Sequence, residues 1–276
     1  MNLVRSALYI PGSKARALEK AATLPCDAIL FDLEDAVAPQ EKAAARSLLA
    51  QMLDEVDYGP RLRLVRVNGA ATDWGAADLD AFADHPGVDG ILLPKVDGAG
   101  DLQAPGTKPL WAMMETPLAL LNAPAIAAHP RLRGLVMGTN DLLKDLGARF
   151  RPDRAGLAAG LGLCLLAARA HGKLALDGVY NAFKDQPGLE AECLQGRDLG
   201  FDGKTLIHPD QLDTANRIFA PSEGEIDLAR RQIAAFDAAK ARGEGVAVLD
   251  GKIVENLHIV TARATLDKAR AIAGMT

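Results

Sequence analysis

Short apolar runs alternate with amphipathic segments along most of the chain. Eight of these runs are almost continuously apolar instead of alternating with polar residues. That pattern is typical of strands in a parallel sheet covered on both faces. The predicted strands are Ser6–Ile10, Ala28–Leu33, Leu62–Val67, Gly90–Leu93, Leu110–Met114, Gly134–Met137, Ala175–Val179 and Gly203–Ile207.

The intervening segments have helical periodicity or high helix propensity. Eight strands that alternate with helices predict the α/β class and a closed (β/α)8 TIM barrel, with its site at the carboxyl ends of the strands. An open doubly wound sheet is the alternative, but it usually carries a glycine-rich phosphate turn after its first strand, and YIPGSK is a weak substitute. The predicted helices include Ser13–Leu24, Gln40–Val56, Asp78–Asp84, Leu118–Ala128 and Arg154–His171.

The chain continues well beyond the eighth strand. We expect the barrel to occupy residues 1–220 and a C-terminal helical extension to occupy residues 221–276. The extension contains a predicted helix at Glu223–Arg242, an apolar stretch at Val246–Val254 and a last helix near Leu257–Ala273 that Gly274 closes. This tail exceeds what barrel closure needs, so we expect it to pack on the barrel or on a neighbouring subunit.

Composition narrows the class of protein. The 276 residues are 49% apolar with a net charge of -5, which is ordinary for a globular enzyme, and the lack of a basic block argues against nucleic-acid binding. No apolar stretch reaches the roughly 20 residues of a membrane span, and Pro11-Gly12 interrupts any signal-peptide pattern. Cys26, Cys164 and Cys193 have no metal or redox spacing, so we expect reduced, packed thiols in a cytoplasmic protein.

Polar residues gather where the predicted strands end. Glu115 and Asp141 follow consecutive strands, and a carboxylate next to a core is costly unless something uses it. Two such carboxylates could hold one hard cation through oxygen, with water and substrate at the other positions. The plainer alternatives are that Asp141 caps the next helix and that His208 is a structural strand-end residue. The other strand-end residues are Asp32, Glu34, Asp35, Arg66, Asn68, Lys95, Asn140 and Asn181.

Seven segments together carry a family resemblance: DLEDAVAPQEKAAAR, VRVNG, ILLPKV, METP, GTNDL, IHPDQ and LDGKIVEN. In this order, over nearly the whole chain, they resemble the citrate lyase beta subunit family, which includes malyl-CoA and citramalyl-CoA lyases and lies within the HpcH/HpaI aldolase superfamily. The resemblance implies a Mg²⁺-dependent carbon–carbon lyase. Such an enzyme cleaves a 3-hydroxyacyl thioester (citryl, malyl or citramalyl) into a 2-oxo acid such as oxaloacetate and an acetyl-type thioester.

The resemblance also implies roles for individual residues. The family's metal ligands fall on Glu115, which also faces the substrate, and on Asp141; its substrate-carboxylate arginine falls on Arg66. Glu34 and Asp35 match an acidic pair near the metal's water ligands. A guanidinium can hold a carboxylate with two parallel hydrogen bonds, which lysine cannot reproduce.

Two positions depart from the family pattern. Asn140 stands where the family commonly has Glu, and Glu255 stands where it has the Asp that serves as acid/base, supplied by a neighbouring subunit in several members. Glu255 keeps the carboxylate but adds a methylene, and a displacement of about 1 Å can cost on the order of 100-fold in rate. We expect Glu255 to act in trans within a homo-oligomer, a trimer or a dimer of trimers by resemblance.

The turn after the first strand is a candidate for holding the thioester carrier, either CoA or an acyl-carrier protein. Ser13, Lys14 and Arg16 would offer backbone N–H groups and two cations to a phosphate; an ordinary helix start capped by Ser13 is the alternative. Two other functions stay open at this stage: an aldolase of free 2-oxo acids, and a non-catalytic barrel subunit of a larger lyase complex. Retention of Arg66, Glu115 and Asp141 argues against the latter.

Overall fold

The computed structural model describes residues 3–274, which form two compact units. The larger unit runs from Val4 to Arg217, and the smaller one contains the chain from Ile218 onward together with Leu3. Among the described residues, no helix is long and apolar enough to cross a membrane.

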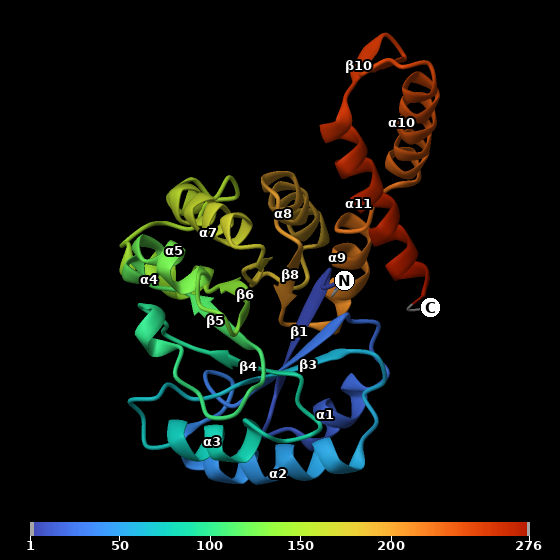
Figure 1. Cartoon of the computed structure of the whole chain (residues 1–276). Coiled ribbons are helices and arrows are strands. Elements are labelled where there is room, and N and C mark those ends of the chain that lie inside the picture. Colours follow the sequence, from blue (N-terminus) through green and yellow to red (C-terminus); the bar gives the residue numbers. More distant parts are fainter. Residues whose placement is uncertain (1–2, 275–276) are drawn as a thin grey trace. The chain divides into compact units, whose positions relative to one another are not determined.

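The larger unit is built on a closed barrel of eight parallel strands, each hydrogen-bonded to the next and the last to the first (Figure 1). This confirms the predicted TIM barrel, and all eight predicted strands are present. The strands are β1 (Ser6–Pro11), β2 (Ala28–Asp32), β3 (Leu62–Arg66), β4 (Gly90–Leu93), β5 (Leu110–Met114), β6 (Leu132–Met137), β7 (Leu174–Asp177) and β8 (Gly203–Leu206).

Side chains of different size fill the interior of the barrel. Small residues such as Ala7 and Ala28 share this core with larger ones such as Leu64, and the Trp111 ring lies where a side chain at position 134 would otherwise stand. Position 134 is therefore a glycine, because only hydrogen leaves room for the indole. Trp111 is a packing residue.

Helices surround the barrel strands and join one strand to the next (Figure 1). They are α1 (Ala15–Ala21), α2 (Lys42–Glu55), α3 (Gly75–Phe82), α4 (Pro117–Leu121), α5 (Ala123–Ala127), α6 (Thr139–Asp145), α7 (Ala158–Ala170), α8 (Gln186–Leu199) and α9 (Leu212–Ile218). Short 3₁₀ helices lie at Pro39–Glu41, Ala99–Asp101, Ala155–Leu157 and Pro209–Gln211.

Two connections differ from the predicted pattern. The single helix expected over Leu118–Ala128 is two short helices, α4 and α5, which meet at Asn122. Pro124 explains the break, because it has no N–H to continue the hydrogen bonding of α4. After β4 the chain forms only a 3₁₀ turn, so this strand has no α-helix of its own.

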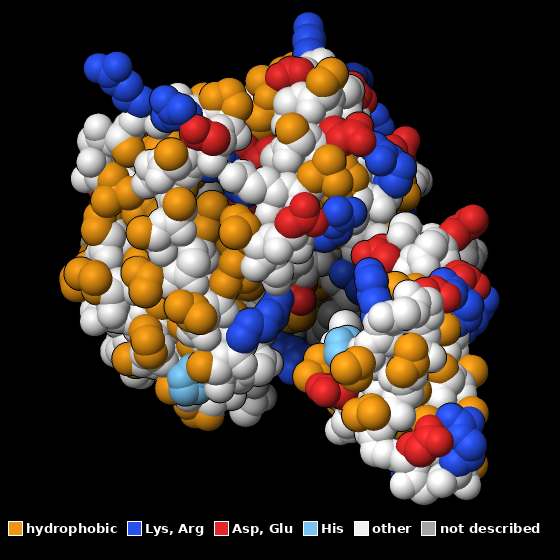
Figure 2. Space-filling model, turned by 90° about the horizontal axis from the view of Figure 1, so that it is seen from above, with side chains coloured by type: hydrophobic (Ala, Val, Ile, Leu, Met, Phe, Trp, Pro, Cys, Tyr) orange, Lys and Arg blue, Asp and Glu red, His pale blue; other side chains and the backbone are white. Residues whose placement is uncertain are grey.

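The outer surface of the larger unit carries exposed apolar side chains on two neighbouring helices. Leu118 and Leu121 lie on α4, and Leu163 and Leu166 lie on α7; all four are exposed. Figure 2 shows apolar side chains spread over a broad area of this unit. α7 has no charged residue before Arg169, so most of this helix is uncharged as well as apolar.

The smaller unit consists of two long helices and a hairpin: α10 (Glu223–Ala241), β9 (Ala247–Leu249), β10 (Lys252–Val254) and α11 (Asn256–Ala273). The two helices pack side by side (Figure 1). The stretch predicted only as apolar is this hairpin, whose turn has Asp250 and Gly251 both at positive φ, as a tight two-residue hairpin turn requires. Ala239, Val254 and Ile259 form part of its own small core.

Candidate functional site

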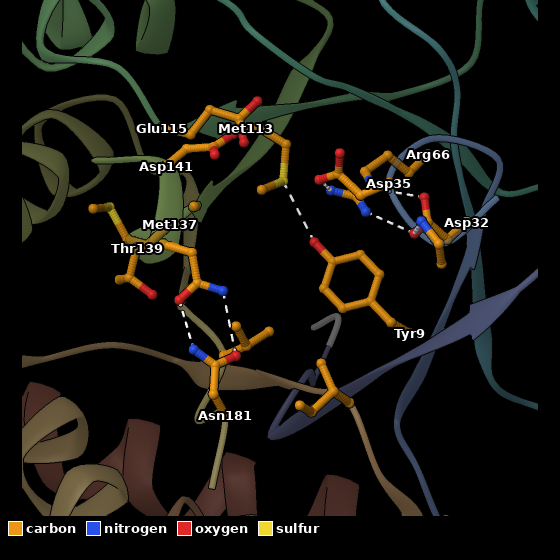
Figure 3. A pocket seen from close by; sticks show the side chains of 15 residues that line it. Tyr9, Asp32, Asp35, Arg66, Met113, Glu115, Met137, Thr139, Asp141 and Asn181 are labelled. Atoms are coloured by element: carbon orange, nitrogen blue, oxygen red, sulfur yellow. Dashed lines mark hydrogen bonds and ion pairs between the residues drawn. The ribbon is translucent and has the colours of Figure 1, made fainter. Parts of the chain in front are cut away.

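The predicted end of the barrel contains a cavity of about 290 Å³. Residues at or just after the carboxyl ends of β1, β2, β3, β5, β6, β7 and β8 line it. Figure 3 shows Glu115 and Asp141 on one side, Arg66 and Asp32 on another, and Tyr9 between them. The barrel therefore brings together many of the strand-end residues that the sequence singled out, whereas Glu34, Asn68 and Lys95 line a neighbouring pocket.

Glu115 and Asp141 form a carboxylate pair around a cation position. Glu115 is buried directly after β5, and Asp141 lies in the first turn of α6, so it does not cap that helix. The ammonium of Lys95 hydrogen-bonds to Asp141 and lies 3.5 Å from Glu115 Oε1, while the Lys95 backbone N–H donates to the same oxygen at 2.7 Å. A positive group thus already stands between the two carboxylates.

The local backbone lets these carboxylates approach. A Cβ at Gly138 would lie 2.7 Å from Glu115 Oε2, so only glycine fits between β6 and the Glu115 side chain. Lys95 itself has a positive φ of 52°, a strained conformation for a residue with a side chain.

The donor set suits Mg²⁺, which prefers oxygen ligands and keeps several waters. Glu115 and Asp141 supply carboxylate oxygens, and Lys95 shows that a cation is accommodated between them. Within residues 3–274 no three His, Cys, Asp or Glu side chains group as metal ligands. Glu115 and Asp141 would be the protein ligands of Mg²⁺, with water and substrate at the remaining positions, and this assignment stays a prediction.

Arg66 lies opposite this pair and is held rigidly. Asp32, its register partner on β2, binds Nε at 2.8 Å and Nη2 at 2.6 Å, and Glu34 Oε2 lies 2.9 Å from Nη1. Burial works to lower the Arg66 pKa, but the hydrogen bonds and charge of Asp32 outweigh it, and the pKa is raised well above its ordinary value. Arg66 is therefore a permanent cation beside the cavity, and Asp32 occupies the Nε and Nη2 edge of its guanidinium group.

Glu34 and Asp35 follow β2; Asp35 lines the cavity, whereas Glu34 lines a neighbouring pocket and reaches the site through its contact with Arg66. Asp32 fixes their turn by accepting hydrogen bonds from the backbone N–H groups of Glu34 and Ala36, at 2.9 and 3.1 Å. Burial raises the pKa of Glu34 to about 7; Arg66 opposes this shift, whereas Asp35, Glu115 and Asp32 add to it. A carboxyl group with this pKa can exchange a proton near neutral pH.

Three further residues that line the cavity were given no role from the sequence. Tyr9 projects from β1, and its hydroxyl lies 3.5 Å from the sulfur of Met113. Asn140 and Asn181 exchange amide hydrogen bonds of 3.3 and 2.7 Å across the opening. The two asparagines were visible as strand-end residues, but Tyr9 lies within an apolar run and resembled an ordinary core residue.

The proposed carrier residues lie after β1, outside the cavity lining. Lys14 and Arg16 are exposed, and the seven-residue helix α1 begins after Lys14 without any side-chain cap. Ser13 therefore is not the cap considered above, and its buried Oγ has no hydrogen-bond partner among the described residues. His208 is structural: its ring stacks on Phe183 at 4.6 Å, and its Nδ1 accepts the Asp210 N–H.

Glu255 belongs to the smaller unit, where it is exposed directly before α11. Its backbone N–H donates to His258 Nδ1 at 3.0 Å. It is thus a member of a different unit from Arg66, Glu115 and Asp141.

The known proteins that are similar to this chain include a thioesterase and a lyase subunit. It is 67% identical over 273 residues to a (3S)-malyl-CoA thioesterase of Cereibacter sphaeroides, covering 98% of this chain and 95% of the relative. It is 36% identical over 281 residues to the citrate lyase subunit beta of Escherichia coli, covering 96% and 93%.

A solved structure has the same architecture. It is the Mycobacterium tuberculosis protein CitE in complex with magnesium, acetoacetate and coenzyme A, with a TM-score of 0.84, 31% identity and coverage of 97% of this chain and 98% of that one. The HpcH/HpaI aldolase/citrate lyase family matches residues 5–209. The predicted resemblance is confirmed: this chain belongs to the HpcH/HpaI aldolase/citrate lyase family.

Proposed function

We propose that this protein is a Mg²⁺-dependent enzyme that hydrolyses the CoA thioester of a 3-hydroxy dicarboxylic acid of the malyl type. The observation that carries this proposal is the 67% identity to a (3S)-malyl-CoA thioesterase over nearly the full length of both chains. The cavity supports the proposal, because it offers a cation position and a fixed guanidinium to an anionic substrate.

Each residue has a definite part in this reaction. Glu115 and Asp141 would hold Mg²⁺, which supplies a Lewis acid toward substrate oxygens. Arg66 would bind the substrate's free carboxylate through the N–H groups that Asp32 does not occupy, in place of the contacts that Nη1 makes with Glu34 and Asp35. Glu34 accepts the proton of the attacking water, because its raised pKa lets it take and release a proton near neutrality.

Asn140 and Asn181 form an amide pair at the opening of the cavity. Asn140 is an amide where the family commonly has a carboxyl group, so this pair can orient a substrate but cannot transfer a proton. It fits hydrolysis and carbon–carbon cleavage alike, because the acid of the cleavage reaction would be Glu255.

Carbon–carbon cleavage is the second candidate. The retained Glu115, Asp141 and Arg66 favour it, together with the similarity to citrate lyase subunit beta. In that reaction Glu255 would protonate the enolate. It would do so from a neighbouring subunit, in a trimer or a dimer of trimers; the exposed apolar face of α4 and α7 supports such a homo-oligomer.

The products of malyl-CoA distinguish these functions. Hydrolysis releases malate and the free CoA thiol in equal amounts, whereas cleavage yields glyoxylate and acetyl-CoA with no free thiol. We expect Mg²⁺-dependent thiol release that EDTA abolishes. Formation of glyoxylate without free thiol would show that the protein is a lyase and not a hydrolase. Turnover of free 2-oxo acid adducts alone would indicate an aldolase. No turnover of any thioester in a panel would indicate a non-catalytic subunit.

Subunit mixing tests the trans arrangement of Glu255. Arg66→Ala and Glu255→Ala subunits, each inactive in cleavage, should regain part of that activity when exchanged, because some sites then hold both intact groups. Absence of rescue after verified exchange, or a monomer at micromolar concentration, would exclude a role in trans.

A further inference from the structure

The hydroxyl of Tyr9 is a hydrogen-bond donor that has no strong acceptor in the cavity. The Met113 thioether is its only hydrogen-bond partner among the described residues, at 3.5 Å. A thioether sulfur is a weak acceptor compared with a carbonyl or charged oxygen. Figure 3 shows this hydroxyl in the cavity, between the Arg66 side and the Glu115 and Asp141 side.

The other two tyrosines show what is particular to Tyr9. The Tyr180 hydroxyl donates to Asp185 at 2.6 Å and is satisfied within the protein. The Tyr58 hydroxyl has no partner, but its ring packs edge-on against Phe31 at 5.0 Å and it does not line the cavity. Of the three, only Tyr9 combines an available donor with a position in the site.

The surroundings of Tyr9 keep it a donor. Burial raises its pKa above the ordinary value of about 10, so the phenol keeps its proton at every pH at which the enzyme would work. The Arg66 guanidinium lies 4.8 Å from the ring centre and anchors the ring by a cation–π contact. The ring is thereby held in place before substrate arrives, which a stabilising donor requires.

We propose that Tyr9 donates a hydrogen bond to the thioester carbonyl oxygen of the substrate and to the oxyanion that forms from it; this inference rests on the hydrolysis proposed above. The water oxygen bonds to the carbonyl carbon while the carbonyl electron pair moves onto oxygen. The pair then returns, the carbon–sulfur bond breaks, and the thiolate leaves and takes up the proton that the water lost. Tyr9 keeps its own proton throughout, so acid and thiol are the only products.

Tyr9→Phe removes only the hydroxyl oxygen, and Tyr58→Phe is the matched control. Loss of one donor to an oxyanion costs on the order of 100-fold in kcat. We expect this loss for Tyr9→Phe, with Mg²⁺ affinity and Tm close to those of the parent, and no loss for Tyr58→Phe. Unchanged kcat in Tyr9→Phe, or a tenfold weaker Mg²⁺ affinity, would overturn the role of Tyr9.

A spectroscopic readout separates this inference from the function on which it rests. Acetyl-CoA with a ¹³C-labelled carbonyl, bound to the Mg²⁺-loaded enzyme, should show its thioester band at a lower frequency than in solution, and Tyr9→Phe should return part of that shift. If the parent cleaves malyl-CoA instead of hydrolysing it, the proposed function fails. The frequency of the thioester band still shows whether Tyr9 donates a hydrogen bond to the carbonyl oxygen. An identical shift in parent and Tyr9→Phe would overturn the inference whichever reaction occurs.

Discussion

The barrel unit contains two clusters of charged side chains that differ in how their charges are matched. Beneath α8, two buried cations (Arg154 and Lys204) meet two buried carboxylates (Asp177 and Glu192). At the cavity, five carboxylates meet only two cations, Arg66 and Lys95; the carboxylates are Asp32, Glu34, Asp35, Glu115 and Asp141.

The balanced cluster pairs its charges within the protein, although Arg154 Nη2 has no hydrogen-bond partner among the described residues. Arg154 Nη1 binds both oxygens of Asp177 at 2.7 and 2.8 Å, and Lys204 binds Glu192 at 2.6 Å. Burial works to lower the Lys204 pKa, but Asp177 and Glu192 raise it above its ordinary value, so its charge is retained. Lys204 also donates to the Gly178 carbonyl, and it thereby fixes the chain just before the cavity residues Val179 and Asn181.

The comparison shows that charge is balanced in the buried network beneath α8 and unbalanced at the cavity of the same barrel. Buried charges that cancel within the protein need nothing further. An excess of carboxylates at strand ends is stable only when a cation joins them or when one of them stays protonated. Burial raises the pKa of Glu34 to about 7, and the neighbouring carboxylates add to that shift; the position of Lys95 between Glu115 and Asp141 is a second sign of the excess.

The largest expected effect concerns the unbalanced cluster. Glu115→Gln and Asp141→Asn should each lower Mg²⁺-dependent turnover roughly 1000-fold or more, because the Lewis acid supplies several kcal/mol. Their free energies of unfolding in EDTA should change little, since each removes a charge from an excess. Calorimetric Mg²⁺ titration and urea denaturation check both parts, and undiminished metal affinity in both variants would remove these residues from the site.

The balanced cluster should respond in the opposite way. Asp177→Asn leaves two buried cations with a single carboxylate and should destabilise the fold by about 3–5 kcal/mol in urea. Asp198→Asn is the control, because its pair with Arg197 is exposed and should contribute at most about 1 kcal/mol. A destabilisation of Asp177→Asn no larger than that of Asp198→Asn would contradict the distinction between the clusters.

The sequence predicts the unbalanced cluster better than the balanced one. Strand ends of a parallel barrel converge, so Arg66, Glu115 and Asp141 could be placed in one site from their positions alone. Lys204 lies inside the buried strand β8, and its partner Glu192 comes from α8, the helix that precedes this strand. Periodicity shows which residues are buried but not which buried charges meet.

Other features were out of reach for related reasons. Tyr9 has no polar neighbour in sequence to mark it, since its contacts with Arg66 and Met113 come from other strands. Lys95 was visible at the end of β4, but its contact with both carboxylates depends on its positive φ, which sequence does not show for a lysine.

The pH dependence of activity tests whether Glu34 is the carboxyl group that stays protonated in the cluster at the cavity. If Glu34 is the base, activity should fall as pH drops below about 7, and Glu34→Gln should lose about 100-fold and become independent of pH in this range. Because the folded pKa lies above the ordinary 4.5, stability from protonated Glu34 is present at pH 4.5 and is lost as pH rises through 7.

Free energies of unfolding, measured as a function of pH, check that stability is lost and not gained as pH rises through 7. The parent should lose stability relative to Glu34→Gln between pH 5 and 8, whereas exposed Glu41→Gln should follow the parent. If the activity of Glu34→Gln still falls below about pH 7 as that of the parent does, the group that titrates is not Glu34.

Arg66→Lys tests whether shape matters beyond charge. Lysine keeps the cation but loses the paired bonds to Asp32 and the contact with Tyr9, so substrate affinity should weaken roughly 10- to 100-fold. Binding of malate to the Mg²⁺-loaded enzyme, measured by calorimetry, checks this. Equal affinity in parent and variant would show that Arg66 acts as a charge alone.

The smallest expected effect concerns Lys95, whose ammonium lies between Glu115 and Asp141, at the position proposed for Mg²⁺. Lys95→Met removes this internal competitor, so Mg²⁺ should bind about tenfold more tightly, because one nearby charge is worth roughly 1 kcal/mol or more. Lys144→Met on α6 removes the same charge from an exposed site and serves as the control for net charge. Tighter binding in Lys95→Met alone would show that the carboxylate excess is held in check by this ammonium until metal arrives. Equal affinities in the two variants would mean that Lys95 and Mg²⁺ do not compete, and the excess would then have to be relieved by protonation at Glu34.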